Sequence, residues 1–198
     1  MPFLILNAGN ASAISDDYTP EVTARVARIS FISGDVQIKR ADQSDWERAA
    51  QNLPIVEGDE IATDSNGRLE IQFNSENYLR LSENARLKIT TLRDEGIAVS
   101  LPNGSMSVRV LTFDKDRAYF EIDAPQTTVS VERAGMYRVD AGNRNDSEVR
   151  VSVTDLGQAR IYSENSGFTL KNGRSATIQI DGNYAGEWET SDASRYAD

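Results

Sequence analysis

Apolar and polar residues alternate along most of the chain in short runs, which Gly, Asn, Asp or Pro separates. In Leu69-Glu70-Ile71-Gln72-Phe73, three apolar side chains share one face and two polar side chains share the other. This period of two is typical of strands with one buried face. It predicts strands over residues 26–30, 36–40, 68–73, 78–81, 86–90, 97–101, 105–110, 119–123, 128–131, 137–140, 148–153, 159–162, 167–170 and 176–180.

Helical patterning is limited to one stretch, residues 45–52, with Ser44 or Asp45 as a possible N-cap. Pro54 would end such a helix within about two turns. Many short strands with at most one short helix predict an all-β domain. Stacked antiparallel hairpins could form either a solenoid-like array or a sandwich.

A repeated sequence unit is relevant to the choice between a solenoid-like array and a sandwich. It reads apolar-x-apolar, a turn with Gly, then apolar-x-apolar, and its four copies surround Gly34, Gly104, Gly157 and Gly173. Each half-unit has too few apolar residues to make a stable isolated hairpin, so stacked units would bury a continuous core. Ordinary antiparallel proteins also contain Gly-centred hairpins, so both architectures remain open.

Composition narrows the function classes. A chain of 198 residues with 39% hydrophobic and 26% charged residues fits one globular domain. The net charge of −10 argues against a nucleic-acid partner, because phosphate binding requires a basic face. No run is long and apolar enough to cross a bilayer.

The chain contains neither Cys nor His. This composition excludes disulfides, thiolate or imidazole metal ligands, and Ser-His or Cys-His catalysis. Residues 140–148 offer several oxygen ligands, but they lack the order of a calcium loop and include Arg144. The sequence also has no phosphate-binding loop and no Ser-x-x-Lys pair. We therefore expect no cofactor, no metal and no catalytic residues.

The two ends of the chain differ from its middle. Phe3-Leu4-Ile5-Leu6 followed by Ala11-Ser12-Ala13 is similar to the end of a secretory signal peptide, although no basic residue precedes the apolar run. Residues 1–21 are therefore expected to be a truncated leader, which favours a periplasmic or secreted protein. The β domain is expected over 22–182, and an acidic polar tail over 183–198.

Arginine greatly outnumbers lysine and often falls on the polar phase of the predicted strands. Two interpretations are open: an arginine-lined groove for carboxylates, or a solvated face whose arginines pair with Glu70, Glu121 or Glu148 on adjacent strands. The arginines concerned are Arg68, Arg80, Arg86, Arg109, Arg138, Arg150 and Arg160.

An ordered series of motifs over about residues 27–180 resembles the FecR domain family. It begins with Gly34-Asp35-Val36 and Trp46, and its core is Gly58-Asp59-Glu60-Ile61-Ala62-Thr63 followed by the strand from Gly67. Further motif positions are Gly104, Pro125, Gly135, Tyr137 and Gly173. Gly135-Met136-Tyr137-Arg138 stands where the family has G-T-x-F, as in a shorter G-x-Y-R branch. Gly58 and Gly67 suit turns with positive φ, and Asp59 can cap its own turn.

The resemblance implies a periplasmic β domain that receives a signal from an outer-membrane transporter and governs a sigma factor. The family's cytoplasmic and membrane segments are not found in this sequence, and the family supplies no catalytic residues. We expect a cell-envelope interaction or signalling module with a protein partner. The alternative is a domain that binds cell-wall glycan or another polymer through exposed aromatics such as Trp46, Tyr78 or Trp188.

A docking edge can also be predicted. The strand near the end of the β domain, with Thr177, Ile178, Gln179 and Ile180, carries no charge before Asp181. An uncharged terminal strand can pair with an extended peptide. The acidic tail could instead cover it.

Overall fold

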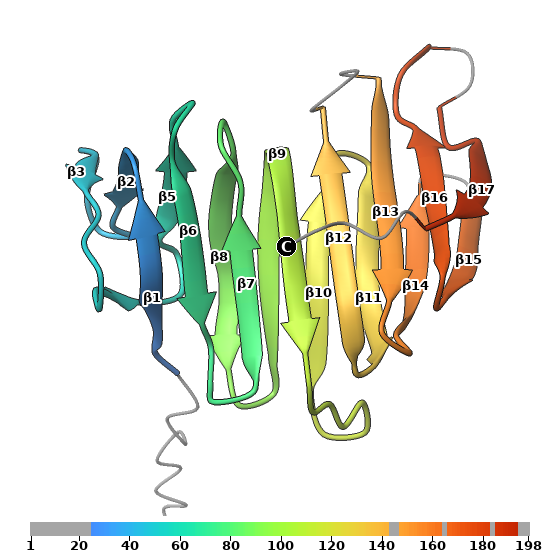
Figure 1. Ribbon diagram of the computed structural model, residues 1–198, viewed down its shortest axis with the longest axis horizontal. Helices are drawn as coiled ribbons and strands as arrows, with labels where there is room; N and C mark the ends of the chain where they lie inside the picture. Colours follow the sequence, from blue (N-terminus) through green and yellow to red (C-terminus); the bar gives the residue numbers. More distant parts are fainter. Residues whose placement is uncertain (1–24, 143–146, 164–165, 183–184, 194–198) are drawn as a thin grey trace, which may run out of the picture.

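The computed structural model describes residues 25–142, 147–163, 166–182 and 185–193. In these residues the chain forms seventeen strands, which lie in two layers along one long axis (Figure 1). The prediction of an all-β domain is confirmed. The expected leader, residues 1–21, lies outside the described residues.

One layer, called sheet A, is held by antiparallel pairing except at one point. Its strands, in spatial order, are β3 (Glu47–Arg48), β2 (Val36–Lys39), β5 (Glu60–Thr63), β8 (Arg86–Arg93), the first part of β9 (Gly96–Val110), β10 (Tyr119–Ala124), β11 (Thr127–Arg133), β14 (Gln158–Ser163) and β15 (Ser166–Lys171). Only β9 and β10 run parallel among the described pairs.

The other layer, sheet B, mirrors this order. Its strands are β4 (Pro54–Ile55), β1 (Ala27–Ser33), β6 (Arg68–Gln72), β7 (Asn77–Leu81), the second part of β9, β12 (Gly135–Ala141), β13 (Glu148–Thr154), β16 (Arg174–Gln179) and β17 (Trp188–Asp192). The long strand β9 therefore belongs to both sheets: residues 96–103 pair within sheet A, and residues 104–110 pair within sheet B.

The four copies of the sequence repeat all lie where the chain crosses from one sheet to the other. Gly34 joins β1 to β2, Gly104 lies at the bend of β9, Gly157 precedes β14, and Gly173 joins β15 to β16. Each repeat is therefore an arch that spans the core, and no copy is a hairpin within one sheet. Stacked arches give the solenoid-like version of the expected fold.

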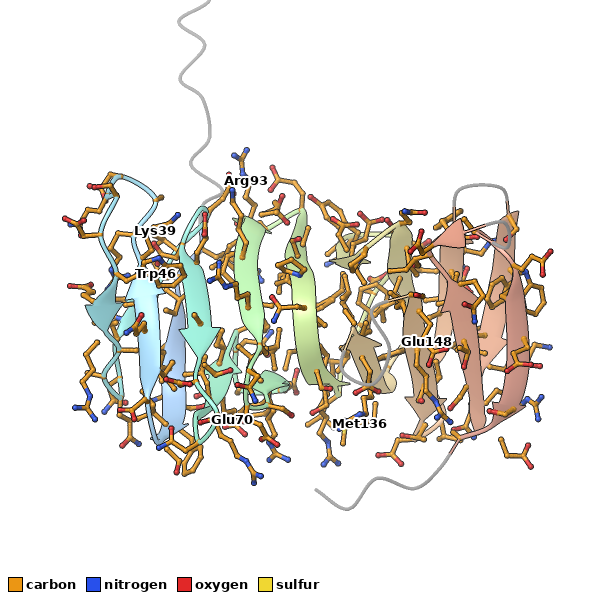
Figure 2. All side chains as sticks on the ribbon, turned by 90° about the horizontal axis from the view of Figure 1, so that it is seen from above. Lys39, Trp46, Glu70, Arg93, Met136 and Glu148 are labelled. Atoms are coloured by element: carbon orange, nitrogen blue, oxygen red, sulfur yellow. The ribbon has the colours of Figure 1, made fainter. Side chains whose placement is uncertain are left out.

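The core lies between the two sheets and runs the full length of the stack. Alternate residues of most strands point into it; in β6, Leu69 and Ile71 are buried while their neighbours are not. The outward residues cover two opposite faces: Lys39 and Trp46 lie on the sheet A side, and Glu70 and Met136 lie on the sheet B side (Figure 2). One continuous cluster contains almost all of the buried apolar side chains.

The expected helix over residues 45–52 does not form. Glu47 and Arg48 pair with β2 as strand β3, and the Ala49 amide donates to the Val36 carbonyl at 2.9 Å. Pairing with an existing strand satisfies these backbone groups, whereas Pro54 leaves too little chain for a stable helix.

The β domain continues beyond its expected end at residue 182. Residues Trp188–Asp192 form β17, which pairs along its length with β16. The stretch expected to be a polar tail thus contributes the last strand of sheet B. No helix in the described part of the chain has the length and apolar character needed to span a membrane.

Candidate functional site

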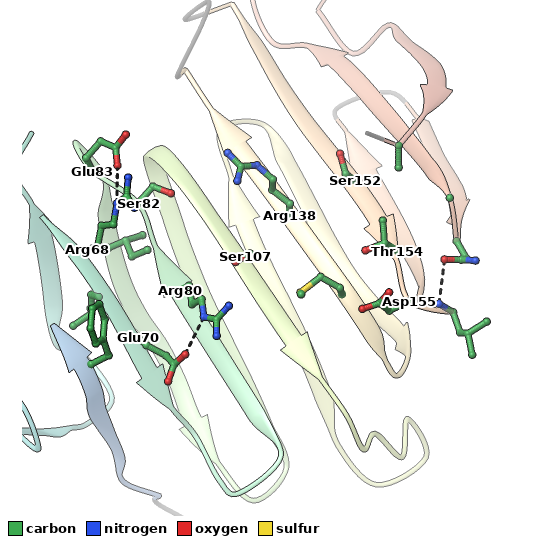
Figure 3. Close-up of a pocket in the computed structure, with 18 residues that line it drawn as sticks. Arg68, Glu70, Arg80, Ser82, Glu83, Ser107, Arg138, Ser152, Thr154 and Asp155 are labelled. Atoms are coloured by element: carbon green, nitrogen blue, oxygen red, sulfur yellow. Dashed lines mark hydrogen bonds and ion pairs between the residues drawn. The ribbon is translucent and has the colours of Figure 1, made fainter. Parts of the chain in front are cut away.

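A groove of about 1390 Å³ lies on the outer face of sheet B (Figure 3). It extends from β1 across β6, β7, β9 and β12 to β13 and the turns beside it. Its floor includes two small outward residues, Ser107 on β9 and Ser152 on β13, and Arg138 of β12 lies between them in the register. Longer side chains on β6, β7 and β12 rise around this floor (Figure 3).

Ion pairs between adjacent strands line one side of the groove. Glu70 and Arg80 are direct cross-strand partners on β6 and β7, with 2.9 Å between the arginine Nε and the carboxylate Oε2. The Ser30 hydroxyl donates to the other carboxylate oxygen at 2.7 Å. Burial opposes ionisation of Glu70, but the hydrogen bonds from Ser30 and Arg80 outweigh it and lower the pKa of Glu70. The carboxylate is therefore held charged and in one orientation.

Two further ion pairs lie nearby. Arg68 lies 3.4 Å from Glu83, in the turn after β7, and Arg138 lies 2.8 Å from Asp140 on the same strand, β12. The Ser105 hydroxyl donates to Asp140 at 2.5 Å. The arginines are thus oriented by neighbouring carboxylates, and the Arg68 side chain remains 70% exposed.

Exposed apolar side chains mark the two ends of the groove. Phe31 on β1 is 52% exposed, and Leu156, in the turn after β13, is 79% exposed. Asp155 and Leu156 both have positive φ, +54° and +69°. A left-handed conformation is unfavourable for a bulky residue. Here the Leu156 amide donates to the Asn172 side chain at 3.1 Å, which helps to fix the turn and holds the leucine outward.

Chemically, this surface is suited to binding. Among the described residues, no group of three or more Asp and Glu side chains is arranged to hold a metal ion. The groove combines oriented arginines, serine and threonine hydroxyls, and apolar ends. Arginine and large apolar side chains are enriched in protein interfaces, whereas serine is not.

The polar strand phase predicted that arginines such as Arg80 pair with Glu70, and this pair forms. Arg68 and Arg138 pair instead with Glu83 and Asp140, which the pattern did not predict as partners. It did not identify Phe31 or Leu156. The signal for Leu156 is a large apolar residue in a turn, between Asp155 and Gly157, where a polar residue is usual.

The family-motif residues lie mainly at the arches and not in the groove. Gly58 has a φ of +92° as expected, and buried Asp59 accepts hydrogen bonds from the Val56 and Ala41 amides. Gly67 does not have positive φ, which corrects that expectation. A side chain there would instead meet the Asp35 carbonyl oxygen at 2.3 Å.

The remaining motif positions are also structural in their contacts. A side chain at Gly104 would meet the Cβ of Ala85 at 2.3 Å, and Pro125 lies in the turn between β10 and β11. A side chain at Gly135 would meet the Cα of Gly157 at 2.3 Å, and Tyr137 is fully buried. Only Gly173 lines the groove.

The predicted docking edge is internal. Strand β16, which includes Thr177, Ile178 and Gln179, is paired with β13 on one side and with β17 on the other. Ile180 follows it and donates its amide to the Ser147 carbonyl. Of the two alternatives weighed for this strand, coverage by the segment after residue 182 is the one observed.

The proposed glycan-stacking aromatics are engaged within the molecule. Lys39 and Arg86 lie 5.6 and 6.0 Å from the ring centroid of Trp46. The Tyr78 hydroxyl donates to the Ser75 carbonyl at 2.8 Å. Trp188 stacks on Phe168 with 3.9 Å between ring centroids.

The fold and groove together define a class of protein: an all-β domain of stacked arches with a polar groove on one face. The sequence model of the FecR family, described as FecR protein, matches residues 59–160, just over half of the chain. The chain therefore belongs to the FecR family.

Solved structures share this fold. Two crystal structures of a protein assigned as an anti-sigma factor from Parabacteroides distasonis, at 1.65 and 2.50 Å resolution, each align with a TM-score of 0.55. Their identity to the chain is 15% and 16%. Each alignment covers 67% of this chain and 59% of the other. At this identity the similarity shows a common fold and nothing more. A comparison with curated proteins gave no match.

Proposed function

We propose that this chain is a non-catalytic protein-interaction module of a signalling system in the cell envelope, and that the groove on sheet B is its docking surface. The observation that carries the proposal is the groove itself, where oriented arginines lie between two exposed apolar anchors, Phe31 and Leu156. Interfaces depend on a few such anchors together with arginine. Membership in the FecR family and the assignment of the Parabacteroides protein as an anti-sigma factor support a regulatory role.

The partner class follows from the dimensions and chemistry of the groove. It spans several strands and mixes both signs of charge, so it suits a protein surface or an extended segment better than a small uniform ligand. A glycan-binding domain is the second candidate, but the rings of Trp46 and Trp188 each already have a stacking or cationic neighbour. We therefore rank it below a protein partner.

Site-specific photocrosslinking tests this proposal. A photoreactive amino acid in place of Ser107, on the groove floor, should yield a discrete protein adduct in the native host. The same substitution at Thr169, on the outer phase of β15 in sheet A, is the matched control and should not give that adduct. Proteolysis of spheroplasts, with the outer membrane removed, should degrade the domain if it is exported.

Binding to purified peptidoglycan separates the two candidates. Sedimentation of the domain with sacculi, without any groove-specific protein adduct, would replace the protein-interaction proposal with the glycan-binding one.

A further inference from the structure

Strand β17 forms the edge of sheet B at the C-terminal end of the stack. In the described residues it pairs only with β16, and all five of its residues, Trp188–Asp192, are exposed. At the other end of the stack the outermost strands, β3 and β4, have two residues each, and β4 begins with Pro54. Very short strands and proline protect an edge from pairing. By contrast, β17 is long enough to accept another strand.

The backbone N–H and C=O groups of β17 point alternately toward β16 and away from it, as the pairing of a further strand requires. The Gln179 amide donates to the Glu187 carbonyl and the Ala193 amide donates to the Gly173 carbonyl, both at 2.9 Å. Both pairs continue the register of β16 and β17. Bonded and non-bonded pairs alternate in an antiparallel ladder. The N–H and C=O groups of Trp188, Thr190 and Asp192 therefore point away from β16, along the outer edge.

Side chains add an apolar contact beside this edge. Trp188 lies opposite Ile178 in the register, so it shares the core-facing phase, and it stacks on Phe168 across the end of the core. Its side chain is still 43% exposed. An inward-pointing side chain of an added strand would cover this exposed ring surface.

The acidic residues of β17 determine which kind of strand can pair with its free edge. Glu187, Glu189 and Asp192 lie in or next to β17, and Asp192 pairs with Arg174 at 2.5 Å. Two β17 edges placed together would bring the carboxylates of both copies onto one seam, which is unfavourable. A strand with lysine or arginine on its outer phase would instead meet Glu189 with opposite charge.

We propose that the β17 edge accepts an extended basic strand of a protein partner by β-addition. This inference rests on the proposed interaction function and identifies a second contact for it, separate from the groove. Backbone pairing supplies the affinity in this mode, and alternate side chains supply the specificity. The added strand would extend sheet B by one strand beyond β17.

A peptide probe tests the proposal directly. The probe is a capped octapeptide of alternating lysine and valine, and its comparison peptide has glutamate in place of lysine. Thr190→Pro removes an N–H that points away from β16 and leaves the β16–β17 bonds in place. We expect it to weaken binding of the lysine peptide at least about tenfold, while Thr190→Ala, which keeps the N–H, binds as the wild type does.

Amide hydrogen exchange locates the contact. Adding the lysine peptide should slow exchange at Trp188, Thr190 and Asp192, and the glutamate peptide should not. Equal binding by the Thr190→Pro and Thr190→Ala variants would overturn the edge assignment, as would protection confined to other strands. Self-association of the wild type that Thr190→Pro abolishes would overturn the basic-strand assignment in favour of a second copy.

The crosslinking experiment keeps the two proposals apart. If the adduct at Ser107 forms while the peptide fails to protect β17, the edge proposal is wrong and the interaction function stands. If neither result is obtained, both are wrong.

Discussion

Buried polar side chains at the arches hold the molecule together at the residue scale. Tyr137, on β12, is fully buried, and its hydroxyl lies between the carbonyl oxygens of Arg133 and Gln158. It also accepts the Gln158 amide at 3.1 Å. One phenol thus joins the start of β14, just after the arch at Gly157, to the end of β11, just before the arch at Gly135.

Replacing Tyr137 by Phe should destabilise the fold by about 1–3 kcal/mol, because buried backbone groups lose their partner. The unfolding midpoint in urea, with an unchanged slope, measures this. A variant as stable as the wild type would mean that water replaces the hydroxyl.

The same residue predicts a pH dependence. Burial raises the pKa of Tyr137 from 10.0 to about 12, against the lowering effect of its hydrogen bonds with Gln158 and Arg133. Because the pKa is raised on folding, this group stabilises the fold fully below pH 10, and that contribution is lost as the pH rises through about 12. Stability of the wild type should therefore fall more steeply across this range than that of Tyr137→Phe, as followed by circular dichroism.

Asp59 supports a second prediction. Its carboxylate is 1% exposed and lies 2.9 Å from the Arg40 guanidinium. Asp59→Ala would leave the Val56 and Ala41 amides without their acceptor and Arg40 with only the more exposed Glu47 as an ionic partner, so it should cost about 3–5 kcal/mol. Asp94→Ala, which breaks the exposed pair with Arg25, is the control and should cost no more than about 1 kcal/mol. Similar decreases in the free energy of unfolding of both variants would show that the buried Asp59 pair stabilises the fold no more than an exposed pair does.

At the scale of elements, glycines set how closely two arches approach each other. Gly135 at the start of β12 lies against Gly157 in the arch between β13 and β14, where an added Cβ would be 2.3 Å from the Gly157 Cα. Backbone atoms cannot yield as a flexible side chain can. The close approach of these two segments therefore requires the absence of a side chain at Gly135. An added Cβ at Gly157 would instead meet the Val153 side chain at 2.9 Å and the Tyr137 hydroxyl at 3.0 Å.

Gly135→Ala should destabilise the domain by about 3 kcal/mol, since the two segments must separate. Gly173→Ala is a matched control: its φ is +77°, but no heavy atom lies within 4 Å of the added methyl. That control should cost only about 1–2 kcal/mol from backbone strain. Thermal unfolding of both variants would show the difference, and a reversed order would contradict the packing explanation.

Alternation alone was sufficient to predict most strands, because each sheet has one buried face and one solvated face. It could not predict β3 and β4, which have two residues each and form because neighbouring strands are available. It also missed β17, whose only apolar residue is Trp188, and the strand β5 (Glu60–Thr63) was not among the predicted ones. The repeat could be recognised at its glycines, but whether an arch or a hairpin forms depends on long-range pairing.

In the groove, too, some residues could be predicted from the local sequence pattern, and others depend on how distant strands are arranged. Glu70 and Arg80 could be proposed as partners because both lie on polar strand phases. Phe31 and Leu156 could not, because their place at the ends of one groove depends on the order of the strands between them.

At the scale of the whole molecule, the stack has a middle and two ends that differ in stability. Each strand in the middle is paired on both sides; the second part of β9, for example, lies between β7 and β12. By contrast, β4 and β17 each have one described partner, β1 and β16. In arrays of this kind, local opening starts at the ends.

Hydrogen exchange should therefore be slowest in β7, β9 and β12 and fastest in β3, β4 and β17. Mass spectrometry of peptic fragments measures this gradient. Uniformly slow exchange in all strands, the terminal ones included, would show that the stack opens only as one cooperative unit.

The long strand β9 gives the domain a mechanical property. Hydrogen bonds between strands run along the long axis of the stack, so tension applied at its ends would peel strands off one pair at a time (Figure 1). At β9 a single covalent chain belongs to both sheets, so neither layer can be pulled away there without the other. Under load, the terminal strands would be released first and a folded centre around β9 would remain.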